Sequence, residues 1–343
     1  MENVLPFKSG EETLPFSSQH ALTNLQALVA YDMTQVNNHI LKRMESPVAL
    51  IPQLAGHLIA SGGKRLRPML TIAAAKLCGY EGTRHTKLAA CVEFIHTATL
   101  LHDDVVDESG MRRGKQTANV VWGNQASVLV GDYLLSRSFE LMVEDGSLKV
   151  LKILSSAAAT IAEGEVLQLM MANNISTDED SYMEVICAKT AALFSAACQV
   201  SSVVSEKSDE EELALNSYGM NLGIAFQLID DVLDYSAKQA TLGKSIGDDF
   251  REGKLTLPTI LAYRRGTQDE RDFWKRTMER RKQSEGDLEK ALAILQTHDA
   301  LSGTVDRARH YGGKAIDALT IFPKSKIRDA LVAIVGFCID RAY

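Results

Sequence analysis

The chain has 343 residues, of which 45% are hydrophobic, so it is long enough to bury a large apolar core. Its formal net charge of −7 argues against nucleic acid as the main partner, because nucleic-acid-binding domains carry clustered positive charge. The five cysteines are odd in number and none lies in a Cys-x-x-Cys pair, so we expect small buried thiols in a reducing compartment.

The amino terminus shows no signal-peptide pattern. Its first four residues, Met1 to Val4, are acidic overall and lack a basic segment. No stretch approaches the roughly 20 consecutive apolar residues that cross a bilayer. These features predict a cytoplasmic protein.

Helical periodicity runs through nearly the whole chain, and only seven prolines interrupt it. Alternating strand patterns that end in Asn-Gly or Asp-Gly turns are absent. We predict an irregular lead-in over residues 1–18 and a single domain over 19–343, because no linker-like segment divides the remainder. The predicted helices lie at about 20–44, 47–60, 68–77, 84–107, 117–144, 148–171, 178–204, 209–235, 256–264, 268–282, 286–311 and 325–341. The fold class is therefore all-α, an orthogonal helical bundle with a central cavity.

The first chemical signal in chain order is the segment Gly62-Gly63-Lys64-Arg65-Leu66-Arg67-Pro68. Its glycines let the backbone approach a ligand closely, and its proline suits the first turn of a helix. A helix N-terminus beside clustered cations is a natural diphosphate site. A basic surface turn is the alternative interpretation.

Three aspartates, Asp103, Asp104 and Asp107, end the predicted helix 84–107 among apolar residues. At about 100° per residue their side chains leave one arc of the helix, while Val105 and Val106 point away from it. Carboxylates at the rim of a buried region need a partner, because unpaired buried charge is very costly. An acidic capping cluster is the alternative.

A basic loop, Arg112-Arg113-Gly114-Lys115, follows Asp107 within five residues. Directly after a metal-binding triplet, such a loop is suited to hold the phosphate that the metal bridges. His96 lies seven residues before Asp103, on nearly the same helix face, where it can donate to a phosphate oxygen. Without the triplet, a solvated loop and a core histidine would be the simpler interpretations.

The triplet spacing recurs at Asp230, Asp231 and Asp234, again between apolar residues. We predict that both triplets bind Mg²⁺ that carries a diphosphate, since Mg²⁺ takes hard oxygen ligands and commonly combines one or two carboxylates with phosphate oxygens. The glycine-spaced segment 242–254 that follows is expected to close over the site. Its Gly243-Lys244-Ser245 is not a P-loop, because the first glycine and the preceding strand are missing.

Together these motifs resemble those of trans-polyprenyl diphosphate synthases. The resemblance rests on residues 62–68, on Phe94 to Asp104 and on Phe226 to Asp231, and it extends over about residues 20–343. It implies the isoprenoid synthase type of helical bundle and a head-to-tail prenyltransferase. The substrates would be isopentenyl diphosphate and an allylic diphosphate, and the cofactor Mg²⁺.

The resemblance also implies roles for individual residues. Mg²⁺ would be held by Asp103, Asp107 and Asp230, with Asp104, Asp231 and Asp234 in supporting positions. Arg112 resembles the arginine that contacts the allylic diphosphate. Isopentenyl diphosphate, which binds without metal, would contact Lys64, Arg67, His96 and Arg113. Further substrate-contacting positions match Lys189, Thr190, Gln227, Lys244 and Lys254.

The helix before Asp103 is expected to form a wall of the tunnel that receives the growing product. Cys91, Ile95, Ala98 and Thr99 lie on one stripe of that helix. In the family, aromatic residues four and five positions before the motif stop the product short. Here Thr99 and Ala98 occupy those positions, which predicts an octaprenyl to decaprenyl product for a quinone side chain.

Several alternatives remain open from the sequence. They include a geranylgeranyl or shorter-chain synthase, a class I terpene cyclase, a structural bundle and a non-catalytic subunit of a two-component prenyltransferase. The subunit is disfavoured because this chain keeps all six aspartates. The resemblance further implies a homodimer and is compatible with transient membrane contact when the product leaves.

Overall fold

The computed structural model describes residues 18–60, 63–112, 114–236 and 246–341. Within these ranges the structure is helical apart from one two-stranded hairpin. The α-helices are α1 (Ser18–Arg43), α2 (Leu50–Ala60), α3 (Leu66–Leu77), α4 (Arg84–Val106), α5 (Ala118–Trp122), α6 (Asn124–Asp145), α7 (Leu148–Met171), α8 (Glu179–Ile186), α9 (Ala192–Val204), α10 (Asp209–Asp234), α12 (Asp248–Glu252), α13 (Leu257–Arg265), α14 (Gln268–Trp274), α15 (Asp287–Thr297), α16 (Ala300–Ala318) and α17 (Lys326–Asp340). Two π-helical segments, η1 (Cys187–Ala191) and η2 (Lys275–Glu279), and one 3₁₀ segment, η3 (Leu319–Ile321), join them.

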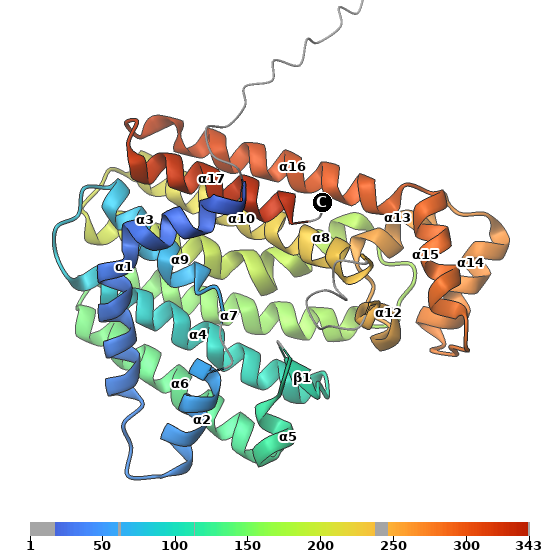
Figure 1. Cartoon of the computed structure of the whole chain (residues 1–343), viewed down its shortest axis with the longest axis horizontal. Helices are drawn as coiled ribbons and strands as arrows, with labels where there is room; N and C mark the ends of the chain where they lie inside the picture. The colour runs from blue at the N-terminus through green and yellow to red at the C-terminus, as the bar shows by residue number, and fades with distance from the viewer. Residues whose placement is uncertain (1–17, 61–62, 113, 237–245, 342–343) are drawn as a thin grey trace, which may run out of the picture.

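The helices pack in successive layers. Figure 1 shows α16 and α17 along one edge, with α10, α9 and α7 crossing the centre and α4 and α6 beyond them. Direct packing joins α10 to α16, α9 to α10, α7 to α9, and α4 to α6. The predicted all-α class is therefore confirmed.

Two clusters of buried apolar side chains lie in the bundle. The larger joins α1, α3, α4, α6, α7, α9 and α17, and the smaller joins α8, α10 and the helices from α12 to α16. Helix α10 contributes to both, with Tyr218 and Leu222 in the first and Leu228 and Ile229 in the second. The end of α10, which carries the second aspartate triplet, is thus anchored in a packed core.

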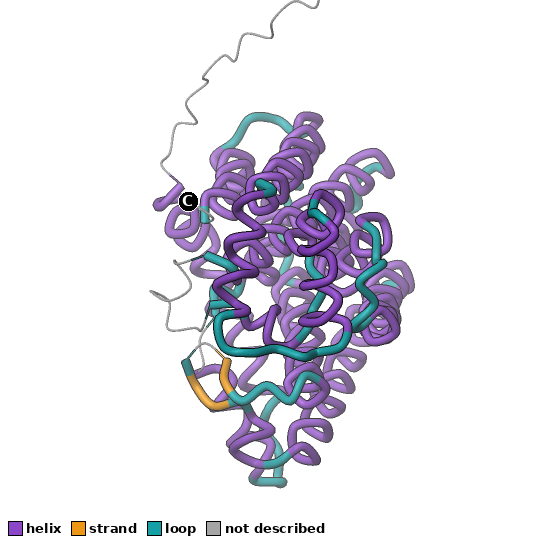
Figure 2. Tube along the Cα trace, turned by 90° about the vertical axis from the view of Figure 1, so that its right-hand side faces the viewer, coloured by secondary structure: helices purple, strands orange, loops and turns teal. Residues whose placement is uncertain are grey.

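Several predicted boundaries were wrong for identifiable reasons. The predicted helix 117–144 is split at Gly123, whose φ of 87° is a conformation that glycine adopts at little cost. The predicted helix 286–311 breaks before Asp299 and continues as α16 to Ala318. In the basic loop, β1 (Met111–Arg112) pairs antiparallel with β2 (Lys115–Gln116) (Figure 2), a short hairpin that leaves the all-α class unchanged.

One helical stretch passes the length and composition test for a membrane span, contrary to the expectation from the sequence. It covers Glu179–Val204, and an 18-residue window within it has a mean hydropathy of 1.3 and is 61% buried inside the protein. Because this stretch packs against α7 and α10, we interpret it as a core helix. The predicted lead-in over 1–18 lies outside the described residues except for Ser18, which begins α1.

Candidate active site

The carboxylates of the first triplet are each paired with a cation from a different segment. Asp103 Oδ2 lies 3.9 Å from Lys189 Nζ, on η1. Asp104 Oδ1 accepts hydrogen bonds of 2.9 and 2.7 Å from Arg112, on the hairpin strand β1. Asp107 caps the end of α4 and accepts a 2.8 Å hydrogen bond from Lys254. Three separate elements therefore bring positive charge to one helix end.

Lys189 is placed by the π-helical segment that carries it. Its ammonium donates 2.8 Å hydrogen bonds to Glu165 and Gln168, both on α7. Close packing of α7 against η1 depends on Gly164, because a Cβ there would lie 2.8 Å from the Lys189 backbone nitrogen. π-Helical turns of this kind are frequent at functional sites.

The second triplet is held differently. Asp230 is partly exposed and forms a 2.7 Å ion pair with Arg341, the residue after α17. Asp231 is buried and accepts hydrogen bonds from Tyr182 on α8 and from Gln227, at 2.8 Å, on α10 itself. Asp234 is also buried and accepts a 3.0 Å hydrogen bond from the backbone N–H of Asp249, in the first turn of α12.

Two pairs of contacts bring the triplets to one site. Lys189 contacts Asp103 of the first triplet. Its neighbour Thr190 donates a 2.9 Å hydrogen bond to Gln227, on the helix that carries the second triplet. Lys254, in the segment after the second triplet, reaches back to Asp107 of the first. The described residues of both triplets therefore surround a common region.

Two carboxylates of the site have raised pKa values, because burial disfavours their negative charge. Burial raises the pKa of Asp103 from 3.8 to about 7, with Glu165 and Asp107 adding to the effect and Lys189 opposing it. Burial likewise raises the pKa of Asp231 to about 7, against the hydrogen bonds from Tyr182 and Gln227. These raised pKa values indicate a site that favours added positive charge.

The negative charge of the site also raises the pKa of Lys254. Burial alone would lower the pKa of its ammonium, but the carboxylates of Asp107 and Glu252 outweigh burial and raise it. Lys254 is therefore held in its charged form beside the first triplet.

The donor set fits Mg²⁺ bound together with phosphate. The exposed or half-buried carboxylates Asp103, Asp107 and Asp230 offer hard oxygen ligands. In the described part of the chain, no three His, Cys, Asp or Glu side chains come close enough together to hold an ion alone. This arrangement fits Mg²⁺ ions that take their remaining ligands from diphosphate oxygens and water.

The basic residues of the Gly62–Pro68 segment lie beside aromatic rings. Arg67 is within 3.2 Å of His96 Nε2, and its guanidinium lies 4.3 Å from the centre of the Phe194 ring. Lys64 lies 4.7 Å from the centre of the Phe337 ring. The structure thus places Arg67 beside His96, and the predicted contact of Lys64, Arg67 and His96 with isopentenyl diphosphate stays a prediction. Arg113 and Lys244 lie outside the described residues.

Sequence reasoning missed several residues that contact the predicted site residues. They are Glu165, Gln168, Tyr182, Asp249 and Arg341. Arg341 also stacks 4.9 Å from the Phe226 ring centre, and one of its terminal nitrogens is buried with no hydrogen-bond partner among the described residues. Only the run Gly247-Asp248-Asp249 carried a visible signal, as acids in a glycine-spaced segment.

The predicted chain-length stripe lies on a face of α4 that is mostly buried in the bundle. Cys91, Ile95 and Ala98 have at most 2% of their surface exposed. Cys91 faces α6, where its thiol approaches the Ser138 carbonyl oxygen at 3.4 Å. The Thr99 hydroxyl donates to the His96 carbonyl oxygen at 2.8 Å, so its methyl group and not its hydroxyl is available to an apolar chain.

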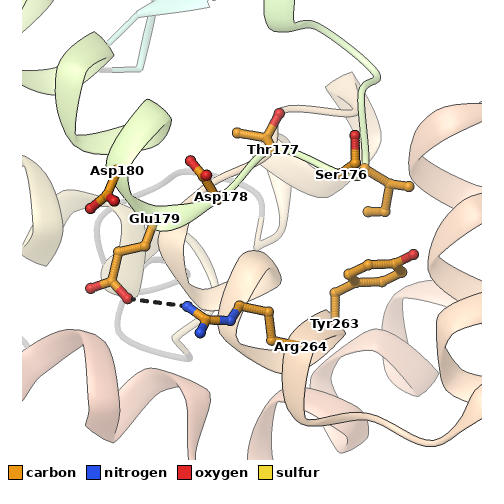
Figure 3. A pocket seen from close by; sticks show the side chains of 8 residues that line it. Ser176, Thr177, Asp178, Glu179, Asp180, Tyr263 and Arg264 are labelled. Carbon is orange, nitrogen blue, oxygen red and sulfur yellow. Dashed lines mark ion pairs between the residues drawn. The ribbon is translucent and has the colours of Figure 1, made fainter.

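A separate hollow of about 480 Å³ lies between the start of α8 and α13 (Figure 3). Two of its acidic residues already have partners. Asp178 caps α8, and Glu179 pairs with Arg307 at 2.9 Å and with Arg264 at 3.8 Å. Because no aspartate of either triplet lines it, we do not include this hollow in the active site.

Comparison with known proteins places these features in context. The family described as Polyprenyl synthetase matches residues 48–295. The chain is 48% identical to the octaprenyl diphosphate synthase of Escherichia coli, over 93% of this chain and 99% of that protein. It is 51% identical to a decaprenyl diphosphate synthase from Rhodobacter capsulatus, with a TM-score of 0.91 over 94% of this chain and 99% of that one. A polyprenyl synthase from Caulobacter crescentus, solved with calcium and isoprenyl diphosphate, is 50% identical, with a TM-score of 0.91 over 98% of this chain and 100% of that one.

Proposed function

The chain belongs to the polyprenyl synthetase family, and on that premise we propose that it is a long-chain trans-polyprenyl diphosphate synthase. It is a prenyltransferase that condenses isopentenyl diphosphate onto an allylic diphosphate. We propose an octaprenyl to decaprenyl product, destined for a ubiquinone side chain. The observation that carries the assignment is the convergence of both aspartate triplets and their cations around Lys189 and Thr190.

The first task of the site is to hold and ionise the allylic diphosphate. Asp103, Asp107 and Asp230 are the residues that would hold Mg²⁺, which supplies positive charge beside the departing diphosphate. Arg112, Lys189 and Lys254 now pair with carboxylates of the first triplet. With Mg²⁺ on these carboxylates, the three cations would be available to pair with phosphate oxygens and to stabilise the charge that develops there.

The second task is to bring isopentenyl diphosphate to the allylic cation. We assign its diphosphate contacts to Lys64, Arg67, His96 and Arg113, and a further substrate contact to Lys244. The allylic carbon–oxygen bond breaks, and the isopentenyl double bond attacks the resulting cation to form a carbon–carbon bond. A proton then leaves to the released diphosphate, so the reaction needs no protein nucleophile.

Product length depends on the buried stripe of α4. Ala98 and Thr99 are the first two stripe residues below Asp103, and both are small. A growing chain that leaves the site along α4 meets Ala98 and Thr99 first, then Ile95 and Cys91. The absence of an aromatic side chain at 98 and 99 supports a long product.

We also propose a homodimer through the exposed apolar face of α6 and α7, which pack against each other. Leu129, Phe139 and Val143 on α6 are 66%, 41% and 67% exposed, and Leu169 and Met170 on α7 are 67% and 78% exposed. Apolar surface of this extent on neighbouring helices is typical of an interface. Val143→Arg is expected to convert dimers to monomers in sedimentation velocity experiments.

The remaining assignments follow from these. We propose that residues 19–343 act as one domain, because α10 contributes to both core clusters. We further propose a cytoplasmic enzyme that contacts a membrane transiently, since a long apolar product must leave into lipid.

The direct test is incubation of the purified protein with isopentenyl diphosphate, farnesyl diphosphate and Mg²⁺, followed by chromatography of the dephosphorylated products. We expect a ladder that ends at one long chain and disappears when EDTA replaces Mg²⁺. Failure to elongate any allylic primer would contradict the proposal and point to a subunit that needs a partner.

A further inference from the structure

Four side chains, one of them Asp231 of the second triplet, form a continuous row of hydrogen bonds. Tyr182 donates its hydroxyl proton to Asp231 Oδ2. Gln227 donates from Nε2 to Asp231 Oδ1 at 2.8 Å. Thr190 donates from Oγ1 to Gln227 Oε1 at 2.9 Å. Residues from α8, α10 and η1 therefore meet through side chains alone.

The row has a fixed direction because its members differ in what they can donate. Both oxygens of Asp231 accept, Oδ2 from Tyr182 and Oδ1 from Gln227 Nε2, so the NH₂ end of the Gln227 amide faces Asp231. The carbonyl end of that amide must then face Thr190. A hydroxyl has a single proton, and Thr190 donates it to Gln227. The Thr190 oxygen can therefore only accept from, or face, any other group.

Tyr182 holds the far end of the row. It is 5% exposed and packs in the smaller core cluster, and Asp231 is 4% exposed. Both oxygens of Asp231 thus have a donor inside the protein. A buried carboxylate oxygen that loses its donor is costly, so without the tyrosine hydroxyl this carboxylate would turn toward other donors.

We propose that Tyr182 is a positioning residue of the condensation reaction, which acts through Asp231 to fix the orientation of the Gln227 amide and to keep the Thr190 hydroxyl oxygen an acceptor toward the allylic cation. The inference rests on the proposed function. Under this proposal Asp231 has a different role from Asp230 and Asp103, because it accepts the hydrogen bonds of the row and does not bind the metal.

The first test compares two buried tyrosines. Tyr182→Phe removes only the hydroxyl of the row, and Tyr218→Phe removes a hydroxyl that donates to the Leu331 carbonyl oxygen at 2.9 Å in the other core cluster. With farnesyl diphosphate and isopentenyl diphosphate, we expect Tyr182→Phe to lower kcat about tenfold. Both KM values and the Mg²⁺ concentration for half-maximal activity should stay within about twofold. Tyr218→Phe should keep the wild-type kcat, and the two variants should have similar Tm values.

The second test exchanges the amide and the carboxylate. Gln227→Glu alone places a second carboxylate against the buried carboxylate of Asp231, and we expect kcat to fall at least about a hundredfold. Adding Asp231→Asn restores one amide against one carboxylate, with Thr190 again donating to residue 227. We expect the double variant to regain at least about tenfold over Gln227→Glu.

The outcomes separate this inference from the proposed function. Elongation by the wild-type enzyme together with an unchanged kcat in Tyr182→Phe would overturn the inference alone. A raised Mg²⁺ requirement in Tyr182→Phe, or a double variant slower than Gln227→Glu, would also overturn it, since either result makes Asp231 a metal ligand. Absence of elongation by the wild-type enzyme overturns the proposed function itself.

Discussion

The two aspartate triplets have the same spacing, but the structure supports them in different ways. The first lies at the end of α4, and its three carboxylates pair with Lys189, Arg112 and Lys254. The second lies at the end of α10, where Asp230 pairs with Arg341. Asp231 accepts from the side chains of Tyr182 and Gln227, and Asp234 accepts from the backbone N–H of Asp249. The first triplet is thus suited to exchange partners when a diphosphate binds. The second is suited to hold its geometry unchanged.

The strongest test asks whether both triplets are needed despite this difference. Asp103→Ala and Asp230→Ala should each lower turnover at least about a thousandfold, because each removes a metal-facing carboxylate. Circular dichroism should show a folded protein in both cases. Asp306→Ala, which removes an exposed carboxylate on α16, is the matched control and should keep full activity. Substantial residual activity in either variant would remove that aspartate from the metal site.

A second test extends the comparison to the residues that precede each triplet. Ala98 and Thr99 precede the first, whereas Ala225 and Phe226 occupy the same positions before the second. If the product leaves along α4, Ala98→Phe should shorten it to about three or four isoprene units, because the ring blocks the stripe. Ala98→Ser should leave the chain length unchanged. Chromatography of dephosphorylated products measures both.

The opposite change on α10 completes that test. Phe226 lies between Arg341 and Phe194, with ring contacts to both. Phe226→Ala should slow the reaction without lengthening the product. A longer product from this variant would show that the chain runs along α10 and that the wall on α4 is misassigned.

A smaller effect is expected from Arg341, which pairs with Asp230 of the second triplet. Arg341 pairs with Asp230 and would compete there with the proposed metal, so Arg341→Gln should lower the Mg²⁺ concentration for half-maximal activity about threefold. Arg309→Gln, an exposed arginine on α16, serves as the control. An unchanged or higher Mg²⁺ requirement in Arg341→Gln would indicate that Asp230 does not bind metal in competition with the arginine.

The smallest effect concerns stability without metal. Asp103 has a pKa raised to about 7, so between pH 4 and 7 the folded protein binds more protons than the unfolded chain. Stability therefore falls as pH rises through that window. Asp103→Asn should remove this loss and raise Tm by about 2–5 °C at pH 8, with little change at pH 4. Scanning calorimetry with EDTA measures the difference, and a Tm gain of equal size at both pH values would contradict the burial argument.

Much of the fold and part of the site were visible in the sequence. Helical periodicity located most helices, because an apolar face repeats locally every three to four residues. The errors fell where a single backbone conformation matters, as at Gly123, and the hairpin 111–116 was not predicted because it is too short to show an alternating pattern. The close packing of α7 on the π-helical segment at Lys189 was also not predicted, because it depends on Gly164 in a helix distant along the chain from Lys189.

The sequence by itself determined that this chain is an all-α protein with two aspartate triplets and a basic glycine segment, since spacing along one helix is a local property. Only the tertiary structure decided what each carboxylate faces. Lys254 and Asp107 are 147 residues apart in the chain, and Arg341 and Asp230 are 111 apart. Such pairs form because the packed core holds distant segments together, and burial then decides which carboxylates stay charged and which need a donor. Tyr182 and Arg341 could therefore be assigned only from the folded protein.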